Sequence, residues 1–254
     1  MNVLVTSGGT IAPIDDVRQI RNVSTGRFGA TIAEAALTRG AHVWYLHTPS
    51  ALRPIDRSAR FDLQSADPAA EFARLARLHE DWHAVRDRLR LVPLPTGTMP
   101  EYAERFRTLL TNQPFDVAFL AMAAADYAPD PTPGKLTSTA DELVIRCRRL
   151  PKLIATARDL APALYLVGFK LLSQTPRAEL IRQATEAGRV NRADLTVAND
   201  LATVQAGQHT IHLVRPDQVV ETLGPEDGSI ADLLVDRVFA WSRADRAVNP
   251  VFPE

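Results

Sequence analysis

The stretch NVLVTSGGT, residues 2–10, decides the fold that the sequence predicts. The apolar run from Val3 to Thr6 predicts a buried β-strand, and Ser-Gly-Gly-Thr at residues 7–10 predicts a tight turn at its end. Glycines at this place allow backbone N–H groups to approach an anion closely. A helix with one apolar face is predicted from Gly29 to Arg39, and Gly40 ends it. A strand, a glycine turn and a helix in this order are typical of an α/β protein.

Strands and helices alternate along the rest of the chain. Further strands are predicted at residues 42–46, 89–94, 116–123, 164–169 and 194–198, and further helices from Asp67-Pro68 and from Thr98. Thr98 and Glu101 are predicted to form a capping box at the start of the second of these helices. Because the strands are apolar throughout, the sequence predicts a Rossmann-like, doubly wound α/β fold. In this fold a mostly parallel sheet carries helices on both faces and binds ligands beyond the carboxyl ends of its strands.

The domain organisation is predicted to be simple. We expect one domain over residues 1–254, since no internal repeat is visible. Three prolines between residues 129 and 133 stiffen a segment that is predicted to be a flap at about residues 127–140. The polar tail after Ser242 is expected to be frayed. Cys147 lies in an alternating stretch, so we expect it in the core or on an edge strand.

The composition excludes several classes of function. The 254 residues are 46% hydrophobic and 23% charged, and the formal net charge of −1 creates no field that would attract nucleic acid or an anionic membrane. The apolar runs are too short for a membrane span, and the N-terminal residues lack a secretory pattern. The single cysteine excludes an internal disulfide. We therefore expect a cytoplasmic protein that binds small molecules, with no nucleic-acid or membrane partner.

The basic residues are divided unevenly. Of the 29, only Lys135, Lys152 and Lys170 are lysines, so 29 − 3 = 26 are arginines. A compact ammonium group and a planar guanidinium are not interchangeable beside crowded phosphates. The three lysines are therefore candidates for contact with a phosphorylated ligand, and the alternative is that they are ordinary surface charges.

Two turns near the N-terminus are compatible with anion binding. Gly8, Gly9 and Thr10 follow the first strand, and the turn Ser24-Thr25-Gly26 precedes the first helix. Arg18 and Asn22 lie between the two turns. This spacing suggests a ligand with more than one anionic group, although an ordinary βα turn would have a similar sequence. The dinucleotide fingerprint is absent, because no third glycine follows at the required spacing.

Polar residues also follow the later strands. These candidates for ligand contact are Ala123 and Asp126 after the strand at 116–123, Lys135 on the flap, Leu150-Pro151-Lys152, Phe169-Lys170 after the strand at 164–169, and Asn199-Asp200. Asp126 could accept a hydrogen bond from a ribose, a base or a metal-bound water, and its alternative role is to form the turn.

These segments resemble the signature of the phosphopantothenoylcysteine synthetase family, which also occurs as the C-terminal half of bifunctional flavoproteins. The most specific part is Val5–Thr10 with residues 13–15, 17–18 and 22–26. Matching segments recur from residue 1 to about residue 240, while the flavin-dependent decarboxylase half is missing. VGFKLL at residues 167–172 and Gln208-His209 resemble the bacterial stand-alone members.

The resemblance implies a phosphopantothenate–cysteine ligase of coenzyme A synthesis that forms an acyl-nucleotide and pyrophosphate. It implies catalytic roles for Asn22, which would hold the acyl carbonyl, and for Lys135, which would close the flap over the nucleotide. It implies nucleotide contacts at Asp126, at Phe169 and at the turn Leu150-Pro151-Lys152. The turn and strand-end candidates Gly8, Gly9, Thr10, Ala123 and Lys170 complete the predicted nucleotide-binding set. The implied phosphopantothenate-binding residues are Arg18, Asn22, Ser24, Thr25 and Gly26.

The resemblance also implies the ligands and partners. We expect Mg²⁺ together with the nucleotide, which is CTP by bacterial family habit or else ATP, and no flavin. A homodimer is implied, acting alongside a separate phosphopantothenoylcysteine decarboxylase.

One departure from the family pattern leaves alternatives open. Bifunctional members carry two lysines facing the triphosphate where this chain has Ala187 and Asn191. Lys170, Lys152 or the nearby Arg189 and Arg192 could compensate. A nucleotide-binding protein without ligase activity is therefore a second reading, and a nicotinamide-dependent reductase, motivated by the fold alone, is a third.

HEDWH at residues 79–83 matches the zinc-protease helix motif. No convincing third ligand follows, and the segment lies away from the strand ends. We interpret it as a solvated helix face and expect no metal bound by protein side chains there or elsewhere.

Overall fold

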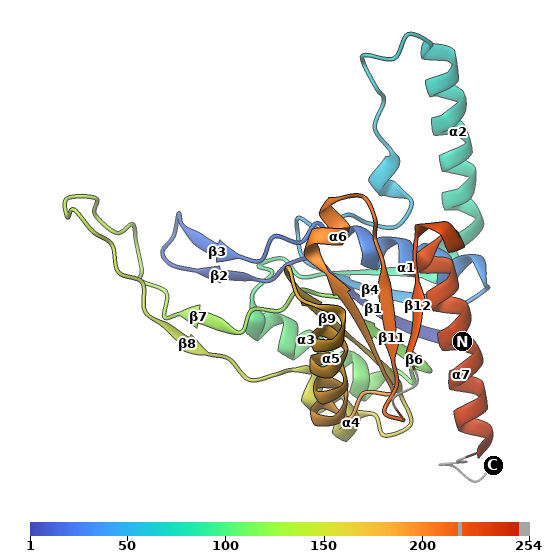
Figure 1. Cartoon of the computed structure of the whole chain (residues 1–254). Helices are drawn as coiled ribbons and strands as arrows, with labels where there is room; N and C mark the ends of the chain where they lie inside the picture. The colour runs from blue at the N-terminus through green and yellow to red at the C-terminus, as the bar shows by residue number, and fades with distance from the viewer. Residues whose placement is uncertain (218–219, 249–254) are drawn as a thin grey trace.

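A computed structural model describes residues 1–217 and 220–248 of the chain (Figure 1). Its centre is a sheet of eight strands in the order β12-β11-β10-β9-β6-β1-β4-β5. The strands are β1 Asn2–Ser7, β4 His42–His47, β5 Leu89–Pro93, β6 Val117–Leu120, β9 Tyr165–Leu172, β10 Leu195–Asp200, β11 Ile211–Val214 and β12 Val220–Leu223. The strands from β10 to β5 are parallel, whereas β11 and β12 are antiparallel and close one edge. The predicted doubly wound, mostly parallel fold is confirmed.

Helices cover both faces of this sheet because the side chains of each strand alternate between two cores. Val3 and Val5 of β1 belong to the core beneath α1 and α7, and Leu4 belongs to the core beneath α3 and α4. A smaller core lies beneath α5. The helices are α1 Arg27–Thr38, α3 Met99–Asn112, α4 Ile154–Leu160, α5 Arg177–Asn191 and α7 Ile230–Val248.

One long helix extends away from the sheet, and only its C-terminal end packs against the core (Figure 1). It is α2, Pro68–Val85, and none of its residues is buried. Its start is as predicted, since the Asp67 side chain accepts a hydrogen bond from the Ala70 N–H at 3.0 Å. The remaining short helices are η1 Asp56–Ser58, η2 Arg86–Arg88, α6 Leu201–Gln205 and η3 Pro225–Asp227. No helix within residues 1–217 and 220–248 is both long and apolar enough to cross a membrane.

Two antiparallel ribbons project from the body of the protein (Figure 1). One pairs β2, Ile11–Pro13, with β3, Gln19–Arg21, and was not predicted. The other pairs β7, Tyr127–Pro129, with β8, Cys147–Arg149, and forms the base of the flap. The flap therefore extends to Arg149 rather than to about residue 140. Cys147 is exposed on β8, so the edge-strand expectation is confirmed and the core alternative is wrong.

Two local predictions were wrong. The Thr98 side chain does not cap α3, because its hydroxyl pairs with that of Thr96. Glu101 reaches back beyond the predicted position and accepts hydrogen bonds from the Thr96 and Gly97 N–H groups. The tail after Ser242 is not frayed over its first part, since α7 continues to Val248, which is where the described residues end.

Candidate active site

Close packing explains why glycine occupies positions 8 and 9 after β1. A Cβ on Gly8, whose φ is +96°, would lie 2.1 Å from the Thr48 hydroxyl oxygen. A Cβ on Gly9 would lie 2.5 Å from the Asn22 carbonyl oxygen. Gly8, Gly9 and Thr10 are all buried, so the turn supports the loop that carries Asn22. This arrangement favours a supporting role for these three residues over the direct nucleotide contact that the sequence predicted.

Thr10 joins the first strand to the end of β6. Its N–H donates to the Ala123 carbonyl at 3.1 Å, and its hydroxyl accepts from the Ala125 N–H at 2.8 Å. The Asn22 side chain donates to the same Ala123 carbonyl through Nδ2 at 2.9 Å. Asn22 and the strand-end segment at 123–126 are therefore held together, although 101 residues separate Asn22 from Ala123.

Asn22 and Asp126 line one cavity of about 280 Å³. Its other lining residues are Ala12, Ile20, Arg21, Ala124, Ala125 and Tyr127. The cavity is thus formed by the β2–β3 ribbon on one side and by the start of the β7–β8 ribbon on the other. Sequence reasoning missed Ile20, Arg21 and Tyr127, because the β2–β3 and β7–β8 pairings that bring them to the cavity have too few residues to produce a strand pattern.

Asp126 connects this cavity to the second group of predicted nucleotide contacts. Its carboxylate forms an ion pair with the Lys152 ammonium, and its carbonyl accepts from the Leu150 N–H at 2.8 Å. Asp126 and Lys152 are both about half exposed, at 56% and 55%. Because the pair is open to solvent, it contributes little to stability. A phosphorylated ligand could therefore displace Asp126 and form an ion pair with Lys152.

The flap carrying Lys135 is tied to the turn after β2. The buried Asp15 carboxylate accepts from the N–H groups of Val17, Arg18 and Leu136, and Arg18 Nη1 lies 2.5 Å from it. Burial opposes ionisation of Asp15, but these hydrogen bonds prevail and lower its pKa to about 2. Arg18 Nη1 also donates to the Leu136 carbonyl at 3.2 Å. The flap residue beside Lys135 is thus held by a charged network.

Arg18 is therefore engaged with the flap anchor, and its side chain remains 33% exposed. Lys135 is exposed and makes no ion pair with any residue of 1–217 and 220–248. Sequence reasoning did not select Asp15, although it lies inside the quoted 13–15 signature, where a carboxylate preceding a Val-Arg pair could have suggested an anchor.

Loss of this anchor is expected to release the flap. In Asp15→Asn, the charged hydrogen bonds to the Leu136 N–H and to Arg18 are weakened, so trypsin should cleave at Lys135 or Arg146 roughly tenfold faster or more. Because the folded pKa of about 2 is below the ordinary 3.8, the anchor is complete above about pH 4 and is lost as the pH falls through about 2.

Asp16→Asn is the matched control for this prediction. The Asp16 carboxylate accepts a hydrogen bond from the Gly134 N–H at 3.1 Å, and Asp16 is exposed. We expect a smaller change in the cleavage rate for this variant. Equal cleavage of wild type and Asp15→Asn would show that Asp15 does not hold the flap.

The turn before α1 is packed against the first strand. The Ser7 hydroxyl donates to the Gly26 carbonyl at 3.0 Å, and the Ser24 hydroxyl accepts from the Gly26 N–H at 3.3 Å. Gly26 has a φ of +72° and is the N-cap of α1, with no side chain capping the helix. Ser24, Thr25 and Gly26 do not line the 280 Å³ cavity. They lie next to it along the chain, because Asn22 precedes them by two residues.

Phe169 and Lys170 lie on opposite faces of β9, since neighbouring strand residues alternate. The Phe169 ring meets Phe28 edge-on at 6.0 Å, and Phe28 meets the His209 ring at 4.8 Å. Burial lowers the pKa of His209, and its Nε2 has no hydrogen-bond partner among the described residues. Phe169 therefore belongs to an aromatic group beside the start of α1, whereas Lys170 points to the side of α4 and α5.

Ala187 and Asn191, where the sequence departs from the family pattern of two lysines, lie on the last turns of α5. Arg189 pairs with Glu186 on the same helix at 2.8 Å. Arg192 instead reaches α4, where it meets Asp159 at 2.6 Å and the Ala155 carbonyl at 3.2 Å. Arg192 therefore lies between α5 and α4, whose first residue follows Lys152 by two positions, whereas Arg189 stays on its own helix.

The HEDWH segment lies on α2 with His79, Glu80 and His83 exposed, which confirms the interpretation as a solvated face. The two histidine Nε2 atoms are 3.0 Å apart. Within residues 1–217 and 220–248, no group of three or more His, Cys, Asp or Glu side chains could hold a metal ion.

We expect His79→Ala/His83→Ala to be as active as the wild type. The pair stands on a helix without buried residues, away from the strand ends. Elemental analysis of the untagged protein should find no stoichiometric zinc. Stoichiometric zinc that disappears on mutation of either histidine would contradict this prediction.

Comparison with known proteins places these features in a family. The model of the DNA/pantothenate metabolism flavoprotein C-terminal domain matches residues 1–81 and 101–241. The chain belongs to this family. Phosphopantothenate–cysteine ligase from Homo sapiens is 30% identical over 254 aligned residues, which cover 89% of this chain and 79% of the human protein.

Two further relatives agree with this family. The coenzyme A biosynthesis bifunctional protein CoaBC from Thermococcus kodakarensis is 28% identical over 215 residues, 85% of this chain. The chain spans 45% of that protein's length. The crystal structure of the DNA/pantothenate metabolism flavoprotein from Streptococcus pneumoniae is 27% identical, with a TM-score of 0.74 over 95% of this chain and 99% of that one.

Proposed function

We propose that the chain is a phosphopantothenate–cysteine ligase, a single domain that acts in the cytoplasm in coenzyme A synthesis. The observation that carries this proposal is the 280 Å³ cavity, in which Asn22 and the Lys152-paired Asp126 meet at the carboxyl end of β6. Family membership and the human ligase relative support the substrate class. The Ser24–Gly26 turn beside the cavity, at the N-terminus of α1, suits the phosphate of phosphopantothenate.

The reaction has two balanced steps. A carboxylate oxygen of phosphopantothenate bonds to the α-phosphorus of the nucleotide, and pyrophosphate leaves. The neutral amine of cysteine then attacks the acyl carbon, the bond to the nucleotide oxygen breaks, and nucleoside monophosphate leaves as the nitrogen loses its proton. Both steps build charge on oxygen, so catalysis depends on positioned donors and cations.

Asn22 would supply a hydrogen-bond donor, and two lysines and an arginine would supply the cations. Asn22 Nδ2 has two N–H donors, and one is held by Ala123, which leaves the other for the oxygen of the acyl carbonyl. Lys135 would lie over the phosphates when the flap closes. Lys152, released from Asp126, and Arg192, at the end of α5 and in contact with α4, would neutralise the remaining phosphate charge.

Mg²⁺ would enter with the nucleotide, which we propose to be CTP or ATP. The cavity offers one carboxylate, Asp126, and that carboxylate is already paired with Lys152. This lining fits an ion held mainly by phosphate oxygens and water, as is usual for Mg²⁺ with a nucleotide. The ion would balance phosphate charge. No flavin is part of the proposal.

The proposal includes a homodimer that works alongside a separate phosphopantothenoylcysteine decarboxylase. The two ribbons expose the apolar side chains Val17, Ile20 and Tyr127, at 64%, 42% and 58%. A second copy would cover such a surface. Sedimentation velocity at two concentrations tests the dimer.

The second candidate is a nucleotide-binding protein of this fold without ligase activity. Ala187 and Asn191 favour it, because neither residue supplies a cation at the last turns of α5.

One assay separates the two functions. Purified protein is mixed with phosphopantothenate, Mg²⁺ and either CTP or ATP, and pyrophosphate is measured with and without cysteine. A ligase releases about one pyrophosphate per site without cysteine and turns over repeatedly with it, forming the amide. Nucleotide binding without phosphopantothenate-dependent pyrophosphate release would reject the ligase and support the alternative.

A further inference from the structure

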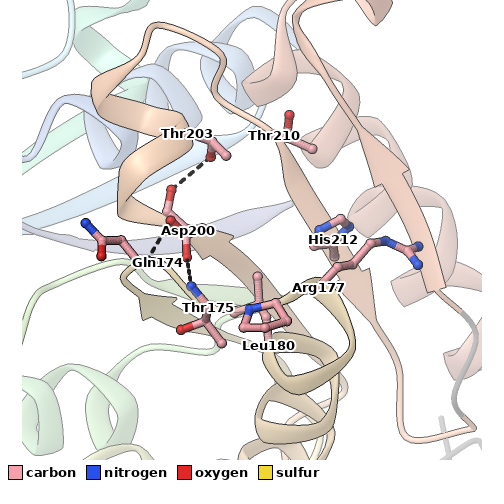
Figure 2. A pocket seen from close by; sticks show the side chains of 9 residues that line it. Gln174, Thr175, Arg177, Leu180, Asp200, Thr203, Thr210 and His212 are labelled. Carbon is pink, nitrogen blue, oxygen red and sulfur yellow. Dashed lines mark hydrogen bonds between the residues drawn. The ribbon is translucent and has the colours of Figure 1, made fainter.

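A second and larger cavity lies apart from the candidate active site. It measures about 480 Å³ and is lined by Gln174, Thr175, Pro176, Arg177, Leu180, Asp200, Thr203, Thr210 and His212 (Figure 2). No residue is shared with the 280 Å³ cavity. It lies at the carboxyl end of β10, two strands from β6, which corresponds to a lateral separation of about 10 Å. A ligand in this pocket would not react with an acyl group held at Asn22.

Asp200 fixes one wall of this pocket. Its carboxylate accepts hydrogen bonds from the N–H groups of Gln174, Thr175 and Ala202, at 3.2, 2.8 and 2.8 Å. The hydrogen bond from Thr175 contributes most to lowering the pKa of Asp200. The charge of Asp200 is therefore already balanced by backbone donors, and its role is to join the end of β10 to the segment before α5.

The opposite wall carries two hydrogen-bond donors without a strong acceptor. Figure 2 shows Arg177 and His212 on the same side of the pocket. Arg177 is exposed, and among the described residues it makes one long hydrogen bond, from Nη2 to the Thr222 hydroxyl at 3.4 Å, and no ion pair. His212 is 8% exposed, and its Nδ1 lies 2.8 Å from the same hydroxyl.

The shared hydroxyl determines which nitrogen of His212 carries the proton. Thr222 accepts from Arg177, and the hydroxyl hydrogen has no acceptor other than His212 Nδ1 among the described residues. Nδ1 is therefore the acceptor, and the neutral ring carries its proton on Nε2. Burial, and then the charge of Arg177, lower the pKa of His212 and keep the ring neutral. Nε2 has no hydrogen-bond partner among the described residues.

We propose that this pocket is a second ligand site, which binds a small oxyanion, a carboxylate or a phosphate, against the wall that carries the Arg177 guanidinium and the His212 Nε2–H. Both groups donate and neither accepts, so an anion is the ligand that satisfies both. Leu180 and Pro176 leave room for a short apolar part beside the charged group. The site goes beyond the proposed ligase reaction, since it shares no residue with that cavity.

The test follows the imidazole resonances of His212 by NMR in the ¹⁵N-labelled chain. Sodium phosphate and sodium acetate are titrated separately over the millimolar range, with sodium chloride at matched ionic strength as the reference. We expect a saturable shift with at least one of the two salts. A saturable shift with phosphate alone would identify the ligand as a phosphate, and a shift with acetate alone would identify it as a carboxylate.

Arg177→Gln is expected to weaken that binding by at least about tenfold, because it removes a charged donor. Arg182→Gln is the matched control, an exposed arginine on the same helix that pairs with Glu179 outside the pocket. We expect it to bind like the wild type. The assay contains no nucleotide, phosphopantothenate or cysteine, so its outcome does not depend on ligase activity.

Two outcomes would overturn the proposal. One is the absence of any saturable His212 shift beyond that caused by sodium chloride. The other is a shift that Arg177→Gln leaves unchanged while thermal unfolding shows both proteins to be folded.

Discussion

Replacing Asn22 by alanine should lower the turnover of the ligase reaction roughly 100-fold or more, the usual effect of removing one oxyanion-type donor. One Nδ2 hydrogen is bonded to the Ala123 carbonyl, and the other is available to the acyl oxygen. Asn22 is exposed, so its truncation leaves no cavity in the core. Steady-state pyrophosphate release and amide formation, each measured at saturating substrates, give the turnover.

Asn22→Asp tests whether the reaction depends on the N–H donor of Asn22 or only on the size and shape of its side chain. Aspartate has the same size but places an acceptor against the Ala123 carbonyl and offers no N–H, so we expect a loss at least as large as in the alanine variant. Gln19→Ala, on the same ribbon but outside the cavity lining, is the control and should keep wild-type turnover. Wild-type turnover of Asn22→Ala would exclude Asn22 as the donor.

Lys135→Arg should lower activity nearly as much as Lys135→Ala. The ammonium is a compact charge that approaches crowded phosphate oxygens, whereas the planar guanidinium needs more room. Lys135 is exposed, and the neighbouring Leu136 is held by the Asp15 carboxylate at 3.0 Å. The flap is therefore anchored beside Lys135, and this anchor limits how far the backbone there can shift to accommodate a bulkier side chain. Initial rates at saturating nucleotide measure this effect.

Arg146→Lys, which reverses the exchange at another exposed flap position, is the control and should remain fully active. Thermal unfolding of all three variants should match the wild type, since both positions are exposed. With nucleotide and Mg²⁺ present, the two Lys135 variants should also be cut faster by chymotrypsin within the flap. If Lys135→Arg retained most of the wild-type rate, the proposed role of the Lys135 ammonium would lose its physical support.

The sequence by itself determined the framework of the protein. The runs at residues 3–6 and 164–169 are apolar throughout, and only a sheet covered on both faces buries every side chain of such a strand. The glycine pair was recognised as a special turn, but its cause was not visible. Gly8 and Gly9 make room for Thr48 and Asn22, which lie 40 and 13 residues further along the chain.

Only the tertiary structure decided how the candidate site is assembled. The two ribbons have strands of three residues, too short for a periodic pattern. Their existence depends on pairing between distant segments. Asp15 fixes Leu136 across 121 residues, and Asn22 bonds to Ala123 across 101.

The second pocket, too, is assembled only by the tertiary structure. Arg177, His212 and Thr222 come from α5, β11 and β12, and nothing in their sequence spacing relates them. A sequence pattern reports which face of an element is apolar, because that depends on local periodicity. Which polar side chains meet depends on strand order and register, and these are settled only when the whole sheet packs.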